Sequence, residues 1–279
     1  MGPETDQERD DRSVCPGRLP EGPADALRAT AEEIAQLLRR APDTGAAVPG
    51  LVWTVGELAA HLAQANELMA DVAAGRPRRH GDGTPEGIAA ANEQALDAFA
   101  ERRAAPLAAM IVTRTEAYLE AVASHPAEET LLTPMGPMNR VVLGSYLLTH
   151  MLGHGFDLAR ALKRPHMVDR ARARLTLPFL LEAMPRVTDA AATAGLNARY
   201  AVRLWGGGRF GVTFTDGTAT VGHAFPDRPD CTISIEPVTF LLMALGRCSP
   251  AGAMARGRVL AWGRRPWLGP RFPEYFTAP

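Results

Sequence analysis

The sequence has few residues of several kinds, and each shortage excludes a class of protein. Only one of the 30 basic residues, Lys163, is a lysine, which argues against a lysine nucleophile or a Schiff base. The formal net charge is −1, so the chain lacks the basic surface of a nucleic-acid-binding protein and any polybasic membrane patch. No apolar run approaches the length of a membrane span. We therefore expect neither nucleic acid nor a membrane as a partner.

Cysteine is also scarce. Cys15, Cys231 and Cys248 are odd in number and widely spaced, so they form neither a disulfide framework nor a CxxC metal site. The first 25 residues lack the apolar centre of a signal peptide and are polar and rich in proline and glycine. These features predict a cytoplasmic protein with a disordered leader over residues 1–22.

Apolar periodicity in the first half predicts helices. Residues 25–40 carry a helical stripe that opens at Asp25. In the segment "WTVGELAAHLAQANELMADVAAG", Thr54 and Glu57 have the spacing of a capping box, so a helix should begin close to Thr54.

Two further helical regions complete the first half. Residues 86–124 predict one kinked helix or two helices, with a break near Pro106. A turn at "TPMGPMN" then precedes an apolar helix that ends before Pro165. Four amphipathic helices with intervening loops predict an antiparallel four-helix bundle over residues 23–165.

The second half has a different pattern. One more helix, at roughly 168–195, precedes the strand-like segments "YAVRLW", "RFGVTFTDGTATVGH" and "DCTISI", with "TDGT" as a hairpin turn. An apolar helix, "VTFLLMALG", and a last strand, "RVLAWG", follow. The pattern predicts a smaller α+β domain over residues 168–279, with meandering strands and a helix on one face.

The clearest functional signal is a group of histidines. His150 and His154, in "LLTHMLGHGFDLARAL", are spaced i and i+4, which places their Cβ atoms about 5–6 Å apart on one helix face. His61 shares a stripe with Leu58 and Leu62 and should face the bundle interior, where facing helices can build metal sites. The alternative is that these are core histidines with ordinary hydrogen bonds. Four others are less suitable because they lie in or beside polar loops or follow a strand: His80, His125, His166 and His223.

Three histidines without a carboxylate would leave a divalent ion its full charge and an open coordination position, which is the catalytic rather than the structural zinc pattern. Such an ion can activate water or a thiol, or polarise a carbonyl. Because the chain's own cysteines are badly placed, a small external thiol is the natural fourth ligand.

The segments "WTVGELAAHL" and "HMLGHGFDLARAL" resemble the DinB-like four-helix bundle of the mycothiol-dependent maleylpyruvate isomerase family. The resemblance implies that His61, His150 and His154 bind a divalent metal, with zinc as the expected ion, and that mycothiol is a cosubstrate. The isomerases carry glutamate where this chain has His150. This departure makes the site similar to the three-histidine arrangement of DinB-like thiol S-transferases.

"DCTISIEPVTFLLMALGR" and "MARGRVLAWG" resemble the sterol-carrier-like domain that is often fused to such bundles. Arg247 matches a C-terminal arginine that the isomerases use near the active site, so the resemblance implies that it could anchor a carboxylate. The alternative for Arg247 is an arginine that faces the carbonyls at a helix end. Asp157 and Arg160, in "HGFDLAR", could form an interhelix salt bridge or orient a ligand histidine.

Together these features predict a metal-dependent enzyme that uses a low-molecular-weight thiol. It would transfer sulfur to a small electrophile, or isomerise that substrate by reversible thiol addition, with transfer slightly favoured. Two alternatives stay open. One is a metal-dependent cyclase or hydrolase that works without thiol, and the other is a non-catalytic protein that binds an apolar ligand. Thiol dependence and metal content separate these three functions.

Overall fold

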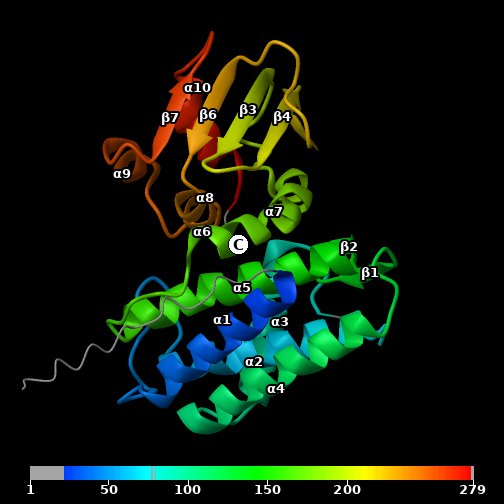
Figure 1. The fold of residues 1–279 in the computed structure, drawn as a ribbon, viewed down its shortest axis with the longest axis vertical. Coiled ribbons are helices and arrows are strands. Elements are labelled where there is room, and N and C mark those ends of the chain that lie inside the picture. The colour runs from blue at the N-terminus through cyan, green and yellow to red at the C-terminus, as the bar shows by residue number, and fades with distance from the viewer. Residues whose placement is uncertain (1–21, 77, 79, 278–279) are drawn as a thin grey trace, which may run out of the picture.

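A computed structural model describes residues 22–76, 78 and 80–277 of the chain. Long helices form one half of the molecule and a five-stranded sheet forms the other (Figure 1). The predicted leader, residues 1–22, lies outside the described residues together with Cys15, except that Gly22 is the N-cap of the first helix. The expected combination of a helical bundle and an α+β half is confirmed.

Four helices form the bundle, and each contacts two others. The first of them, α1, packs against α4 and α5, and α2 packs against the same two helices. Leucine, isoleucine and alanine side chains fill the space between them, with Leu27, Ile34, Leu58, Leu107 and Leu147 almost fully buried. The four helices are α1 (Pro23–Arg39), α2 (Val55–Ala73), α4 (Ala104–Ala123) and α5 (Arg140–Ala161).

The start of α2 is fixed by the predicted capping box. The backbone N–H of Glu57 donates to Thr54 Oγ1 over 3.3 Å, and the backbone N–H of Thr54 donates to Glu57 Oε2 over 2.8 Å. The hydrogen bonds from Thr54 also lower the pKa of the Glu57 carboxyl. This cap sets the rotational phase of α2, so the face that carries His61 points into the bundle.

The region between α2 and α5 differs from the prediction in two ways. Two separate helices are present, α3 (Pro85–Ala98) and α4, and the break spans residues 99–103 rather than lying near Pro106. Pro106 lies in the first turn of α4. Backbone N–H groups in this turn have no acceptor within the helix, so the N–H that proline lacks is not needed there. The expected turn before α5 is part of a two-stranded hairpin formed by β1 (Thr130–Thr133) and β2 (Gly136–Asn139).

The long helix predicted over residues 168–195 is wrong, because three short elements stand in its place. Pro178 and Pro185 lie in the first turns of the second and third of these elements, where proline fits but cannot continue a preceding helix. Asp189 then accepts hydrogen bonds from the backbone N–H groups of Ala191 and Ala192 and forms a turn. The three elements are α6 (Arg170–Leu175), α7 (Leu177–Ala183) and the 3₁₀ helix η1 (Met184–Val187).

The sheet has the strand order β5-β4-β3-β6-β7. The predicted hairpin turn at "TDGT" is confirmed, since Asp216 and Gly217 have φ values of 46° and 85° as a type I′ turn requires. The predicted simple meander is wrong, because β6 pairs in parallel with β3 instead of beside β5. The strands are β3 (Ala198–Leu204), β4 (Arg209–Thr215), β5 (Thr218–Gly222), β6 (Cys231–Ile235) and β7 (Val259–Trp262).

Short helices connect the sheet with the bundle. In Figure 1, α6, α7 and α8 lie between the sheet and α5. α8 contacts α6, and α7 contacts α5. None of the helices in the described part of the chain is both long and apolar enough to cross a bilayer. The remaining elements are α8 (Pro237–Ala244), α9 (Pro250–Ala255), α10 (Leu268–Arg271) and the 3₁₀ helix η2 (Phe272–Tyr275).

Candidate metal centre

The three histidines singled out from the sequence lie together. His61 comes from α2, and His150 and His154 come from α5. Nε2 of His61 lies 2.9 Å from Nε2 of His150, and one ring nitrogen from each of the three histidines lies within 4.8 Å of the others. Among the described residues, this cluster contains no carboxylate or thiol. Two neighbouring helices therefore present three imidazoles to one point.

Burial disfavours the protonated form of these imidazoles. Burial lowers the pKa of His61 and His150 well below the usual value for histidine, and it lowers the pKa of His154 as well. The positive charge of His154 would lower the pKa of the other two further. Neutral imidazole is the form that binds metal ions, because protonation removes the lone pair that a metal needs.

The geometry of the cluster fits a divalent ion. Two nitrogen ligands of a tetrahedral zinc ion lie roughly 3.3 Å apart, since each Zn–N bond is about 2.0–2.1 Å. The spacings of 2.9 Å to 4.8 Å bracket this value. In the described part of the chain, Nδ1 of His150 is also buried without a hydrogen-bond partner. Because Nε2 of His150 is the nitrogen that faces His61, this second ring nitrogen points elsewhere and is not part of the ligand geometry.

A carboxylate and an arginine lie behind His154. Nδ1 of His154 is 3.3 Å from Oδ2 of Asp157, and the Arg247 guanidinium donates to the same carboxylate through Nη2 at 2.9 Å and Nε at 3.3 Å. Burial alone would raise the pKa of Asp157, but hydrogen bonds from His154 and Arg247 outweigh it and hold the pKa below its ordinary value. With Nδ1–H donating to the charged Asp157, Nε2 of His154 is left free for the cluster.

These contacts bear on the alternatives for the residues around the cluster. Asp157 makes a salt bridge to Arg247 in the other half of the chain and contacts the ring of His154, and its role in orienting a ligand histidine stays a prediction. Arg247 also donates to the Leu245 carbonyl, so it partly matches the helix-end alternative. Arg160 is exposed and lies over the Phe156 ring, away from the cluster. That any of these residues binds metal or substrate stays a prediction.

The cluster faces a cavity of about 560 Å³ between the two halves, a volume in the range of small-molecule sites. Its wall includes side chains that the sequence did not indicate. The Trp53 ring lies 4.8 Å from the His61 ring. His80, set aside as a loop histidine, lines the cavity and shares a 2.7 Å hydrogen bond with Asn92.

Tyr146 is the one additional residue that a sequence signal could have identified. It precedes His150 by four positions and therefore lies on the same stripe of α5. Its ring stacks on Phe179 with a centroid distance of 4.3 Å, and burial raises its pKa to about 12. Burial thus favours the protonated phenol of Tyr146, which lines the cavity.

The two described cysteines lie away from this cavity. Cys231 is buried in the sheet, and burial raises the pKa of its thiol to about 11, which makes it a poor nucleophile. Cys248 is partly exposed and lines a separate cavity in the C-terminal half. Within the described residues, therefore, no thiol of the chain itself lines the histidine cavity.

Comparison with protein families matches both halves of the chain. Residues 24–159 match the mycothiol maleylpyruvate isomerase N-terminal domain, and residues 180–263 match the SCP-2 sterol transfer family. No curated protein matches the chain.

Three of the similar solved structures have low sequence identity to the chain. A mycothiol-dependent maleylpyruvate isomerase is 16% identical, with 86% of this chain and 91% of that chain covered and a TM-score of 0.43. A mutant of the same enzyme is 14% identical, with the same coverage and a TM-score of 0.47. A double mutant of the sec-alkyl sulfatase PisA1 is 16% identical, with a TM-score of 0.34. The match to the sulfatase covers 50% of this chain and 24% of that chain, so this chain spans about a quarter of it.

Proposed function

We propose that this chain, whose helical half belongs to the mycothiol maleylpyruvate isomerase N-terminal domain family, is a metal-dependent enzyme that uses mycothiol as a cosubstrate. It joins the whole thiol, through its sulfur, to an electrophilic substrate, or it isomerises that substrate by reversible addition of the thiol. The observation that carries this proposal is the convergence of His61, His150 and His154 on the wall of a cavity of substrate size.

His61, His150 and His154 would hold the metal, with zinc as the natural choice for three imidazoles. When bound, a divalent ion would favour the thiolate form of a nearby thiol, because three neutral ligands leave its double positive charge uncompensated. Among the described residues, no thiol of the chain lines the histidine cavity, and Cys248 lines the neighbouring cavity, so we assign the reacting sulfur to a separate molecule.

The chain's own residues prepare the site for this chemistry. Asp157 orients His154, and Arg247 keeps Asp157 charged. A guanidinium carries five N–H donors, so Arg247 retains donors beyond those used by Asp157 and the Leu245 carbonyl, and it lines the cavity. These donors suit a carboxylate or other anionic group on the substrate or the thiol.

Addition of the thiol to an activated double bond forms a carbon–sulfur bond, and the proton lost from sulfur is returned to the neighbouring carbon. Transfer ends at this adduct. Isomerisation continues by rotation about the new single bond and elimination of the thiol. We favour transfer, because His150 stands where the resemblance to the isomerases would place a glutamate.

Metal content and thiol dependence test the proposal. Wild-type protein should retain about one divalent ion per chain after mild chelation, and His154→Ala should lose it. His125→Ala is the matched control, since His125 is exposed and bonded to the Ala121 carbonyl on α4. A screen of electrophiles with the metal-loaded enzyme should give turnover only when mycothiol or a close analogue is present.

Each other outcome identifies a different function. Full turnover in thiol-free buffer, with metal still required, would assign the protein to the cyclases or hydrolases that activate water. A protein without metal and without turnover would be a binding protein.

A further inference from the structure

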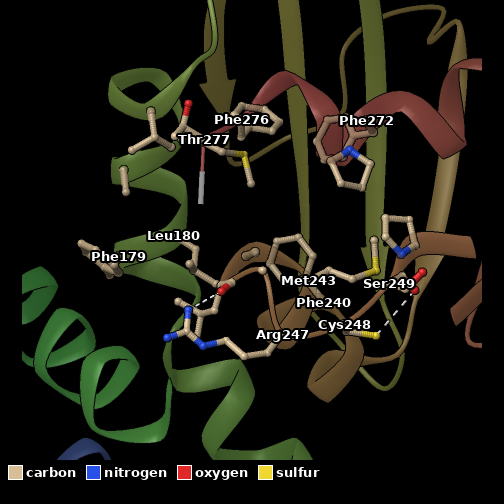
Figure 2. Close-up of a pocket in the computed structure, with 18 of the residues that line it drawn as sticks. Phe179, Leu180, Phe240, Met243, Arg247, Cys248, Ser249, Phe272, Phe276 and Thr277 are labelled. Carbon is tan, nitrogen blue, oxygen red and sulfur yellow. Dashed lines mark hydrogen bonds between the residues drawn. The ribbon is translucent and has the colours of Figure 1, made fainter. Parts of the chain in front are cut away.

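A second cavity, of about 600 Å³, lies in the C-terminal half. Figure 2 shows Phe240 and Met243 of α8 facing into it, Phe272 and Phe276 from the end of the chain on another side, and Leu180 of α7 near Arg247. The wall is mostly phenylalanine, methionine, leucine and alanine side chains. This composition suits a hydrocarbon group, because apolar surface gains free energy when it leaves water.

The second cavity adjoins the histidine cavity. Six residues line both: Met135, Phe179, Val187, Leu245, Arg247 and Thr277. The partition between the cavities is therefore one layer of side chains, and most of that layer is apolar. Met135 has a flexible, unbranched side chain, so it is the member of this layer that can change rotamer at the least cost.

Arg247 is the charged group among these six residues, and it is also the residue that bonds to Asp157 behind His154. The histidines and Arg247 are therefore followed by the apolar wall of the second cavity. A molecule with a polar head and an apolar tail would match this arrangement. Its head would lie beside the histidines and the Arg247 donors, and its tail would extend past Leu245 toward Phe240 and Met243.

We propose that the second cavity binds the apolar tail of the substrate whose reactive group lies in the histidine cavity, so that the substrate class is an amphipathic electrophile. This inference rests on the proposed function and adds the substrate class to it. It also goes beyond the match to a sterol transfer family, because the cavity acts as part of the active site of the bundle and not as an independent carrier site.

A series of straight-chain carboxylates with four to twelve carbons tests the proposal on the metal-loaded full chain. Isothermal titration calorimetry should show affinity rising about three- to four-fold for each added methylene that enters the second cavity, as expected for a buried CH₂ group. Histidine ring signals in NMR spectra should shift on binding, because the carboxylate head lies beside the cluster.

Ala244→Phe is the diagnostic variant, since Ala244 lines the second cavity and does not line the histidine cavity. In this variant the affinity should no longer rise with carboxylate chain length, while the metal content and the affinity for butyrate stay unchanged. Met243→Trp narrows the same cavity and serves as a second variant. Ala255→Phe, at an exposed position on α9, is the matched control and should keep the wild-type dependence.

Two results would overturn the proposal. One is an affinity that does not rise with carboxylate chain length in the wild type, or that rises in both cavity-filling variants as it does in the wild type. The other is tight binding of long chains without any shift of the histidine signals, which would show an independent carrier site. Absence of metal, in contrast, would contradict the proposed function while both binding measurements could still be made on the metal-free chain.

Discussion

Replacing Asp157 with asparagine preserves the shape of the side chain and removes its charge. Asp157 is 3% exposed and its partner Arg247 is 13% exposed, so the substitution leaves a guanidinium largely buried without its anion. Breaking a buried ion pair costs about 3–5 kcal/mol, but the asparagine oxygen can still accept one hydrogen bond, so we expect a loss of about 2–3 kcal/mol in the free energy of unfolding.

The same substitution should weaken metal binding. Asp157 accepts the hydrogen bond from Nδ1 of His154 and thereby directs Nε2 toward the cluster. Removal of such a partner behind a metal ligand typically lowers metal affinity by about 10- to 100-fold. Competition between the protein and a chromogenic chelator measures this change, and urea denaturation measures the change in stability.

Asp230→Asn is a matched control. Asp230 is also a buried carboxylate, with 8% exposure, and it accepts hydrogen bonds from Arg264 and from the backbone N–H of Arg199 in the sheet region. Its replacement should reduce stability without changing metal affinity, because it does not contact the cluster. Equal metal affinities in the two variants would refute the orienting role of Asp157, and unchanged stability in Asp157→Asn would show that the ion pair gives no net stabilisation.

Two further predictions concern pH and domain organisation. The metal-free protein should lose stability as the pH falls below about 6.5, because the histidines of the unfolded chain then bind protons. The pKa values of the three cluster histidines are lowered in the native protein, so the native rings bind these protons less readily. The loss in the free energy of unfolding is up to about 1.4 kcal/mol per pH unit for each cluster histidine. Urea midpoints between pH 8 and pH 5.5 measure this loss, and a flat profile would contradict it. Within residues 23–279, trypsin should cut first at the predicted boundary between residues 23–165 and 168–279, after Lys163, which is exposed at the end of α5 with a φ of 52°. First cleavage within the strands of residues 198–262 would contradict separate domains.

The sequence was sufficient for the features that depend on local geometry. Helical periodicity identified the bundle, and the spacing of Thr54 and Glu57 placed the start of α2. The i, i+4 spacing placed His150 and His154 on one face of α5. His61 could be added because a histidine on an apolar stripe has to face the interior of a bundle.

Features that depend on long-range packing could not be predicted in this way. The pairing of β6 with β3 follows from a crossover that strand periodicity does not encode. His80 lies between α2 and α3 and lines the cavity, and its hydrogen bond to Asn92 leaves no sequence pattern. The break between α6 and α7 depends on prolines that are compatible with either a helix start or a kink.

The contact between Arg247 and Asp157 joins residues 90 positions apart and brings the C-terminal half into the candidate metal centre. Gly153 permits this approach, since a Cβ atom there would lie 3.0 Å from Cδ1 of Leu245, which is tighter than ordinary packing. A displacement of the C-terminal half would therefore change the hydrogen bond that orients His154 and, at the same time, move Leu245 in the partition between the two cavities. Leu245 and Arg247, which are separated by one residue after α8, thus join the wall of the second cavity to the carboxylate that contacts His154.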